Sequence, residues 1–554
     1  MHRCLLINEI LTNIISQAAS TENRIGSPTV AKLSRVCQAF KEPCLDKLWH
    51  NLPSLFPLLK LFPSDAWKLK WGEGLGGDNI EWVDEWHYDV EIVRFEFTRA
   101  LDASDWSRFN AFAPRVRSLW QGDDGERDEY PNNLVPISTL QHLCLHRTTL
   151  KILPNLRSLQ WTDSREEVIQ YMSLFLSEKC THILVNSGSE ATNVDPQLLP
   201  HLVTTCPNLE EFVAWDLSPQ TIISLLIPPG RGFESSTSTF SQPNFPLLRK
   251  LESHTVVPST ILSYFRFHPR LTDLGFQSAD RGLPDLNDAS SFQHLRNLSM
   301  EVPAINEAAL NFLRGIRSPH VEQLRLTTYR DNHCSSTIVH RTCAVASQFL
   351  LLQDLHIEIW STADAPNPEA MTSIPSSHPI FSLRHIQRLY LTVSSLDWDD
   401  TTIATLAKSF PNLETLELIP RYKATKYICR PQVTIAGIES LVQHCPMLED
   451  LGIHIDTANA NSACQRSNVT KSDSSMKHLF VGASLAPHPD RVASILVAYF
   501  PRLSSVTAWD GSTDCRATNA RLLTSKQQWL QVGHLVTQAR RRGEGYGSPK
   551  RRDA

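Results

Sequence analysis

The sequence predicts an α/β solenoid, in which short strand-and-helix units stack one on the next. The first observation is a recurring phrase: an apolar residue, two variable residues, leucine, one variable residue and another apolar residue. It occurs as Leu156–Trp161 and as Leu413–Leu418, each time after a Pro-Asn pair. The second observation is that amphipathic helical stretches separate the phrases. The third is the length of 554 residues, which is too great for one compact core.

The recurrence indicates irregular leucine-rich repeats, because one such unit cannot bury its own apolar face and must stack on its neighbours. The predicted strands begin near Val116, Leu140, Leu156, Cys180, Leu209, Leu248, Leu271, Leu295, Val321, Leu352, Ile386, Leu413, Leu448, Met476 and Leu503. Their mean spacing is roughly 28 residues, at the upper end of the ~20–29 residues of this repeat class. We therefore expect about 15 repeats in a horseshoe-shaped array.

Helices are predicted between the strands wherever apolar residues recur at helical spacing. The clearest stretches are Asp195–Thr205, Thr401–Phe410, Ile435–His444 and Val492–Phe500. Apolar residues at positions i, i+3, i+4 and i+7 give each of them one face to bury. A strand, a turn, a helix and a second turn would then form one repeat.

Alternation along the strands predicts which side chains lie on the concave face of the sheet. If Leu413, Leu416 and Leu418 point inward, Thr415, Glu417 and Ile419 point outward. The same register selects eight candidate substrate-binding residues: Trp120, Trp215, His254, Arg325, Glu358, Tyr390, His454 and Trp509. Aromatic side chains are enriched at binding hot spots, although a shift of one residue would place this set in the core.

Composition divides the chain into four segments. Residues 1–55 form a helical module, and residues 56–110 form a Trp-rich connector with the first repeat cap. Residues 111–530 hold the irregular repeats, and residues 531–554 are predicted to be a basic disordered tail. Segments 231–244, 361–379 and 457–475 are rich in Ser, Thr, Pro or Asn and are predicted to be mobile insertions.

Charge and cysteine content narrow the class of function. The net charge of −5 gives no reason to expect a nucleic-acid or membrane partner, and no apolar run approaches the ~18 residues of a membrane span. The 12 cysteines are expected to be free thiols in a reducing compartment. Cys180, Cys206 and Cys445 each precede a repeat strand and are predicted to be small core residues.

Two motifs have residue types that could carry chemistry, and neither has the context that the chemistry needs. The Gly-x-Gly-x-x-Gly string at Gly72–Gly77 lacks a following helix, so it is a flexible linker rather than a dinucleotide site. His333, Cys334, His340 and Cys343 do not have the spacing of a zinc site. Without a nucleophile elbow or a phosphate loop, the sequence predicts no enzyme, no metal and no cofactor.

The first 50 residues carry three short apolar patterns. Leu6, Ile7, Ile10, Leu11, Ile14 and Ile15 mark one helix; Val30, Leu33, Val36, Cys37 and Phe40 mark a second; Leu45, Leu48 and Trp49 mark a third. Three such helices are small for an independent domain, so apolar surface should remain for a partner to cover. A helical cap on the solenoid is the alternative reading.

The runs Leu6–Leu11, Leu33–Phe40 and Leu48-Trp49 resemble an F-box. With Pro43 to Leu55, Asp105 to Leu119 and the repeats, the chain looks like the F-box proteins with C-terminal leucine-rich repeats that are common in mushroom-forming fungi. Two features depart from that pattern. Asn8 stands where an F-box usually has proline before the Glu-Ile pair, and the Asn or Cys expected after each repeat strand is mostly absent.

The resemblance implies the substrate-recognition subunit of an SCF-type (Skp–cullin–F-box) ubiquitin ligase. Residues 1–55 would be the F-box, linked through the Skp adaptor to a cullin-RING ligase, and the repeats would hold a protein substrate of unknown identity. The implied adaptor-binding residues are Leu6, Ile7, Ile10, Leu11, Ile14, Leu33, Val36, Cys37, Phe40, Leu48 and Trp49. A repeat scaffold without a ubiquitin-ligase role is the alternative. The expected location is cytoplasmic, nuclear or both, because Arg540–Arg542 and Lys550–Arg552 could serve either as a nuclear-localisation signal or as a solvated tail.

Overall fold

The chain divides into two compact units. The computed structural model describes residues 7–20, 28–72, 92–122, 135–163, 165–186, 202–227, 245–279, 283–284, 286, 291–329, 336–359, 372–393, 396–419, 431–458, 474–508 and 520–543. The N-terminal unit comprises Met1–Ile261 and His268–Leu271, and the C-terminal unit comprises Leu262–Phe267 and Thr272–Ala554.

The N-terminal unit begins with three helices: α1 (Asn8–Ser20), α2 (Pro28–Leu33) and α3 (Gln38–His50). Pro28 opens α2, a position where its missing N–H costs nothing. Residues 34–36 form a turn, and α3 then runs without interruption through Pro43. The second predicted helix is therefore too long. Cys37 and Phe40, which were assigned to its end, lie at the start of α3.

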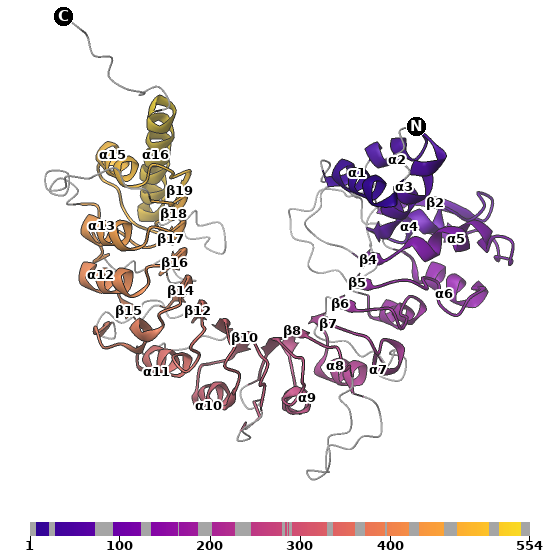
Figure 1. Cartoon of the computed structure of the whole chain (residues 1–554), viewed down its shortest axis with the longest axis horizontal. Coiled ribbons are helices and arrows are strands. Elements are labelled where there is room, and N and C mark those ends of the chain that lie inside the picture. Colours follow the sequence, from indigo (N-terminus) through magenta and orange to yellow (C-terminus); the bar gives the residue numbers. More distant parts are fainter. Residues whose placement is uncertain are drawn as a thin grey trace, which may run out of the picture. The chain divides into compact units, whose positions relative to one another are not determined.

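A parallel sheet follows these helices in the N-terminal unit (Figure 1). Its strands are β1 (Asn51–Leu52), β4 (Ser118–Gly122), β5 (Ser158–Thr162), β6 (His182–Asn186), β7 (Glu211–Trp215) and β8 (Lys250–Val256), paired in that order. The connections contain α6 (Ile137–His146), α7 (Leu202–Thr205), α8 (Pro219–Leu226) and the 3-10 helix η3 (Glu166–Leu174). Each neighbouring pair of strands is parallel, as stacked strand-and-helix units require.

The connector folds around aromatic side chains. It contains α4 (Phe56–Leu59), the antiparallel pair β2 (Trp67–Gly72) and β3 (Ile92–Phe97), α5 (Trp106–Phe112) and the 3-10 helix η2 (Ala113–Arg115). Phe62 contacts Trp106 edge-on with ring centroids 5.0 Å apart, and Trp67 stacks on Phe95 at 5.1 Å. Burying these rings gives the segment a core of its own. The Gly-x-Gly-x-x-Gly string lies outside the described residues apart from the backbone of Gly72.

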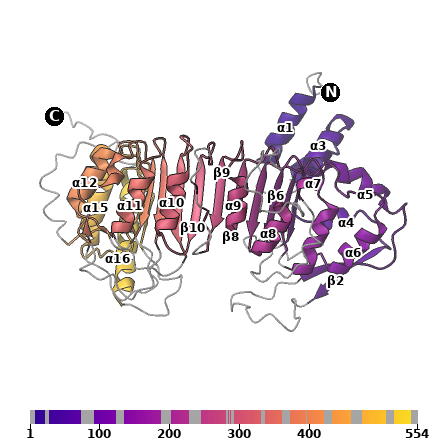
Figure 2. The same ribbon diagram turned by 90° about the horizontal axis from the view of Figure 1, so that it is seen from below.

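The C-terminal unit repeats the same architecture (Figure 2). Its parallel strands are β9 (Asp273–Gln277), β10 (Asn297–Val302), β11 (Gln323–Thr328), β12 (Asp354–Glu358), β14 (Arg388–Thr392), β16 (Thr415–Glu417), β17 (Asp450–Gly452), β18 (His478–Phe480) and β19 (Ser505–Thr507). Its helices are α10 (Glu307–Gly315), α11 (Ser336–Ala346), η6 (Pro379–Ser382), α12 (Asp400–Ser409), α13 (Ile435–His444), α15 (Pro489–Tyr499) and α16 (Ala520–Gly543). A small pair, β13 (Thr372–Ser373) with β15 (Leu396–Asp397), lies apart from the sheet, and α9 (Ser259–Phe265) spans the division of the chain.

Strand side chains alternate between the core and an open face, which we define as the sheet face opposite the helices (Figure 1). In β5 the side chains of Leu159 and Trp161 are fully buried, whereas Ser158, Gln160 and Thr162 are partly exposed. The leucines of the repeated phrase therefore form the core, as the period of two predicts. This arrangement of parallel strands and helices is that of a leucine-rich-repeat solenoid within each unit.

The predicted strand positions are confirmed with one exception. Leu140 lies in helix α6 and not in a strand, because Leu140 and Leu143 are buried at helical spacing. The sheet instead gains β1, which pairs with β4 and was missed because it is only two residues long. Ile419, predicted to point outward, follows the end of β16 and is buried.

The predicted repeat helices agree closely where the chain is described. Helix α13 has the expected bounds, α12 and α15 differ at their ends, and residues 195–201 of the Asp195–Thr205 stretch lie outside the described residues. The expected insertion 231–244 also lies outside them. Cys180, Cys206 and Cys445 are buried free thiols, as predicted.

Helix α16 closes the C-terminal end of the sheet. Residues 531–543, which we expected to be part of a disordered tail, are helical, and Val532 and Val536 are buried. The indole N–H of Trp529 donates to the Ser484 carbonyl at 2.9 Å. The helix therefore acts as a cap that covers the last strands. Among the described residues, no helix combines the length and the apolar character that crossing a membrane requires.

Candidate binding surfaces

The three N-terminal helices enclose a small core. Leu11 and Ile15 of α1, Val30 of α2, and Phe40 and Cys44 of α3 are buried against one another. Leu33, Cys37 and Leu48 are partly buried against the same cluster. Several residues predicted to bind an adaptor, Leu11 and Phe40 above all, therefore hold the helices together.

Other residues of the predicted adaptor-binding set remain on the surface. Ile7 is 48% exposed, Ile14 is 37% exposed and Val36 is 67% exposed. Ile10 is partly buried, and Leu6 lies outside the described residues. Trp49 packs on Phe112 of α5 with ring centroids 4.7 Å apart, so it joins the helices to the connector. Ile14 lies on α1, Ile7 directly precedes that helix, and Val36 lies in the turn after α2; we call these three residues the apolar helix surface.

The open face of the N-terminal unit carries two of the predicted tryptophans. The Trp120 indole N–H donates to Thr162 Oγ1 at 3.0 Å. Trp215 is 37% exposed and meets the His254 ring edge-on at 5.5 Å. The hydrogen bond that Glu252 shares with His254, together with the nearby Lys250, lowers the pKa of Glu252 to about 2. This part of the face thus combines exposed aromatic rings with fixed charges.

The open face of the C-terminal unit brings Arg325, His356 and Tyr390 into one row across β11, β12 and β14. His356 stacks on Tyr390 with ring centroids 5.1 Å apart and planes 20° apart. Burial raises the pKa of the Tyr390 hydroxyl. His356 was not predicted from the sequence, although it has the strand position that selected Tyr390.

Two predicted contact residues of this unit are less accessible than expected. Glu358 is only 2% exposed, and the His356 Nε2 atom lies 3.1 Å from its carboxylate, so it is not an open-face contact. His454 is partly buried, and burial lowers its pKa to about 4. Trp509 lies outside the described residues. Of the candidates in the described part of the C-terminal unit, Arg325 is exposed, and Tyr390 is partly buried, as His454 is.

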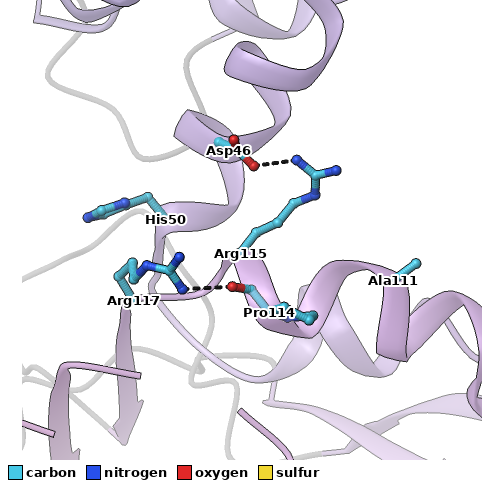
Figure 3. Close-up of a pocket in the computed structure, with 6 residues that line it drawn as sticks. All are labelled: Asp46, His50, Ala111, Pro114, Arg115 and Arg117. Atoms are coloured by element: carbon cyan, nitrogen blue, oxygen red, sulfur yellow. Dashed lines mark hydrogen bonds and ion pairs between the residues drawn. The ribbon is translucent and has the colours of Figure 1, made fainter. Parts of the chain in front are cut away.

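A cavity of about 380 Å³ lies between the end of α3, η2 and the start of β4 (Figure 3). Its lining residues are Asp46, His50, Ala111, Pro114, Arg115 and Arg117. Arg115 forms ion pairs with Asp46 and with Glu42, and it ties α3 to the connector. Burial, with Lys47, Arg117 and Arg157 nearby, lowers the pKa of His50. Sequence patterning missed this cavity because its residues come from segments more than sixty positions apart.

The described residues hold no cluster of three or more His, Cys, Asp or Glu side chains that could bind a metal ion. His340 and Cys343 of the rejected zinc motif lie on α11, where Cys343 is buried, while His333 and Cys334 lie outside the described residues. Burial raises the pKa of the Cys343 thiol to about 12, which leaves it protonated and unreactive at neutral pH.

Comparisons with known proteins support no more than a general likeness. No protein-family model and no curated protein matches the chain. A leucine-rich-repeat protein of Leptospira interrogans is 14% identical over 71% of this chain and 96% of that chain, with a TM-score of 0.27. Rad7, solved in complex with Elc1 from yeast, is 13% identical over 64% of this chain and 81% of that chain, with a TM-score of 0.32.

The functional domain of InlJ from Listeria monocytogenes is a third solved structure to which this chain is similar. It is 12% identical over 68% of this chain and 71% of that chain, with a TM-score of 0.28. At such identities and TM-scores these likenesses carry no argument about what this chain binds.

Proposed function

We propose that the chain is the substrate-recognition subunit of an SCF-type ubiquitin ligase. In this proposal the three N-terminal helices are an F-box that docks on a Skp adaptor, and the repeats hold a protein substrate. The observation that carries it is the apolar helix surface, because Ile7, Ile14 and Val36 face water on a cluster with a small core. The F-box resemblance of the same segment supports the assignment.

The cost of leaving these side chains in water favours a partner that covers them. Burying one fully exposed isoleucine or valine side chain contributes about 1.5–3 kcal/mol, so a partner covering the apolar helix surface would gain several kcal/mol. Exposed large apolar side chains are candidates for such interfaces when they gather into a patch. Leu11, Ile15 and Phe40 are buried in the core beneath the helices, so they would hold the apolar helix surface in place and would contact the adaptor little.

The open faces of the two units are the proposed substrate-binding surfaces. Trp215 with His254, and Tyr390 with His356, place aromatic rings next to charged groups. Aromatic and arginine side chains supply most of the binding energy at protein interfaces, which favours a protein ligand. Such a subunit acts by raising the local concentration of substrate lysines near a conjugating enzyme, and it contributes no catalytic group.

The test is co-purification of the full chain with a Skp adaptor. Ile14→Asp and Val36→Asp should abolish binding, because each places a charge in the apolar helix surface. Asn13→Asp is the matched control, since it adds the same charge at an exposed polar position of α1. Urea denaturation of each variant would establish that the helices still fold.

The outcome separates two functions. Binding by the parent and by Asn13→Asp, with loss in the other two variants, supports the ligase subunit. A folded parent that ignores the adaptor, or equal binding by all four chains, overturns it. The repeats would then belong to a protein-interaction scaffold without a role in ubiquitin transfer.

A further inference from the structure

A cavity in the N-terminal unit, between α3 and the first long strand, lies apart from the surfaces considered so far. Its volume of about 380 Å³ lies in the range of small-ligand pockets, ~300–1,000 Å³. Two of its lining residues, Arg115 and Arg117, are arginines, and His50 lies beside them (Figure 3). None of these residues belongs to the apolar helix surface or to the open faces.

The charges around the cavity are positive overall, although the whole chain carries −5. The cations are Lys47, Arg115, Arg117 and Arg157, and the carboxylates that face them are Glu42 and Asp46. Both carboxylates are engaged by Arg115 alone. Lys47, Arg117 and Arg157 therefore keep positive charge that is not neutralised by these two carboxylates and that would attract an anion.

Arg117 is the best placed donor. Its backbone N–H donates to the His50 carbonyl at 2.9 Å, which fixes the start of β4 against the end of α3. Its Nη1 donates to the Pro114 carbonyl at 2.7 Å. Within the described part of the chain, Nε and Nη2 donate to no partner. A guanidinium held by one nitrogen presents the others in a fixed fork, which suits bidentate contact with phosphate oxygens.

We propose that this cavity binds a phosphate monoester, with Arg117 as the bidentate ligand and His50 as a second donor. The ion pairs that Arg115 forms with Glu42 and Asp46 hold α3 and η2 together at the side of the cavity. The phosphoryl group could belong to a small soluble metabolite or to a phosphorylated side chain of a protein, because both present the same oxygens. The proposal does not depend on the adaptor, since Ile7, Ile14 and Val36 take no part.

The test is titration calorimetry of the full chain at low ionic strength with inorganic phosphate, free phosphoserine and a phosphoserine peptide. Arg117→Gln should weaken phosphate binding about tenfold or more, the effect of losing charged hydrogen bonds. Arg249→Gln is the matched control, because Arg249 holds the equivalent position before β8, where it pairs with Glu210. The affinity of the Arg249→Gln variant for phosphate should equal that of the parent.

Asp46→Asn protects the test against a trivial failure to fold. The variant keeps an oxygen acceptor for Arg115 and removes a repelling charge, so it should bind phosphate several-fold more tightly than the parent. A gain in affinity cannot result from misfolding. A phosphoserine peptide that binds more tightly than free phosphoserine would assign the phosphoryl group to a protein, and equal affinities would assign it to a metabolite. A parent that binds none of the three probes, or an Arg117→Gln chain that binds as the parent does, overturns the proposal.

Discussion

The Asp400 carboxylate joins two successive repeats, because it lies in the first turn of α12 and accepts hydrogen bonds from Thr434 at the start of α13. Its Oδ1 is 2.7 Å from the Thr434 backbone nitrogen, and its Oδ2 is 2.6 Å from Thr434 Oγ1. The Gly437 N–H also donates to Oδ1, at 3.0 Å. One side chain thus satisfies donors at the N-terminus of the neighbouring helix, which would otherwise lack partners.

Asp400→Ala should therefore lower the free energy of unfolding by roughly 2 kcal/mol, the combined effect of losing a cap and charged hydrogen bonds. Lys408→Ala, at an exposed position of the same helix, should change it by less than about 0.5 kcal/mol. Urea denaturation of both variants measures the difference. Equal stabilities would mean that water replaces the carboxylate without loss.

The two faces of the N-terminal sheet can be distinguished with a pair of tryptophans. Trp161 is fully buried, whereas Trp215 is 37% exposed on the open face. Trp161→Ala should cost about 3–5 kcal/mol of unfolding free energy, because it empties part of the core. Trp215→Ala should cost less than about 1 kcal/mol, as surface changes usually do. Thermal or urea denaturation decides, and the reverse order would contradict the strand register.

The repeat fold could be predicted from the sequence because its signal is the spacing of apolar residues along the chain. The leucine phrase recurs at the strands from β4 to β19 that pair in the long parallel series, and even its weakest positions, Cys180 and Met476, precede the strands β6 and β18. Leu140 was assigned wrongly because a short apolar pattern fits a strand and a buried helix equally well. Helix α16 was missed in part because the basic run Arg540–Arg542 follows closely on its buried residues Val532 and Val536.

The candidate sites were predicted less well, because accessibility depends on neighbours that lie far away in the sequence. Period-two alternation placed Tyr390 correctly on the open face but could not show that Glu358 is covered. The helical pattern of the first 50 residues selected Leu11 and Val36 together, yet one is core and the other is exposed. The cavity at Arg117 depends on the packing of α3 against β4, which no local pattern records.

Gly482 occupies a position that admits no side chain. Its φ of +55° lies in the left-handed region, and an added Cβ would fall 2.6 Å from His454 Cδ2 and nearer still to Nε2. Gly482→Ala should lose about 1–2 kcal/mol from backbone strain alone, and more from the clash. Adding His454→Ala should restore only the part of the lost unfolding free energy that the clash causes. A double-mutant cycle by urea denaturation measures that part, and strict additivity would rule the clash out.

Acid should destabilise the C-terminal unit through His378. The side chain is 5% exposed, and its Nδ1 accepts the Ile380 N–H at 3.3 Å at the start of η6. Burial, with the His340 ring 5.0 Å away, lowers the pKa of His378 from 6.5 to about 4. The unfolded chain therefore binds more protons than the folded chain between these values. The His378 contribution to stability is complete above pH 6.5 and is lost as the pH falls toward 4.

His378→Asn isolates this contribution, because asparagine can accept the same N–H bond but does not titrate. The parent should lose up to about 3 kcal/mol of unfolding free energy between neutral and acidic pH through this group, and the variant should lose less. His385→Asn is the control, since His385 is exposed on the same segment. Urea denaturation along a pH series compares the three chains. Parallel curves for the parent and His378→Asn would show that the protonated ring is accommodated, for example by local opening of η6, and that buried His378 does not set the acid limit of the unit.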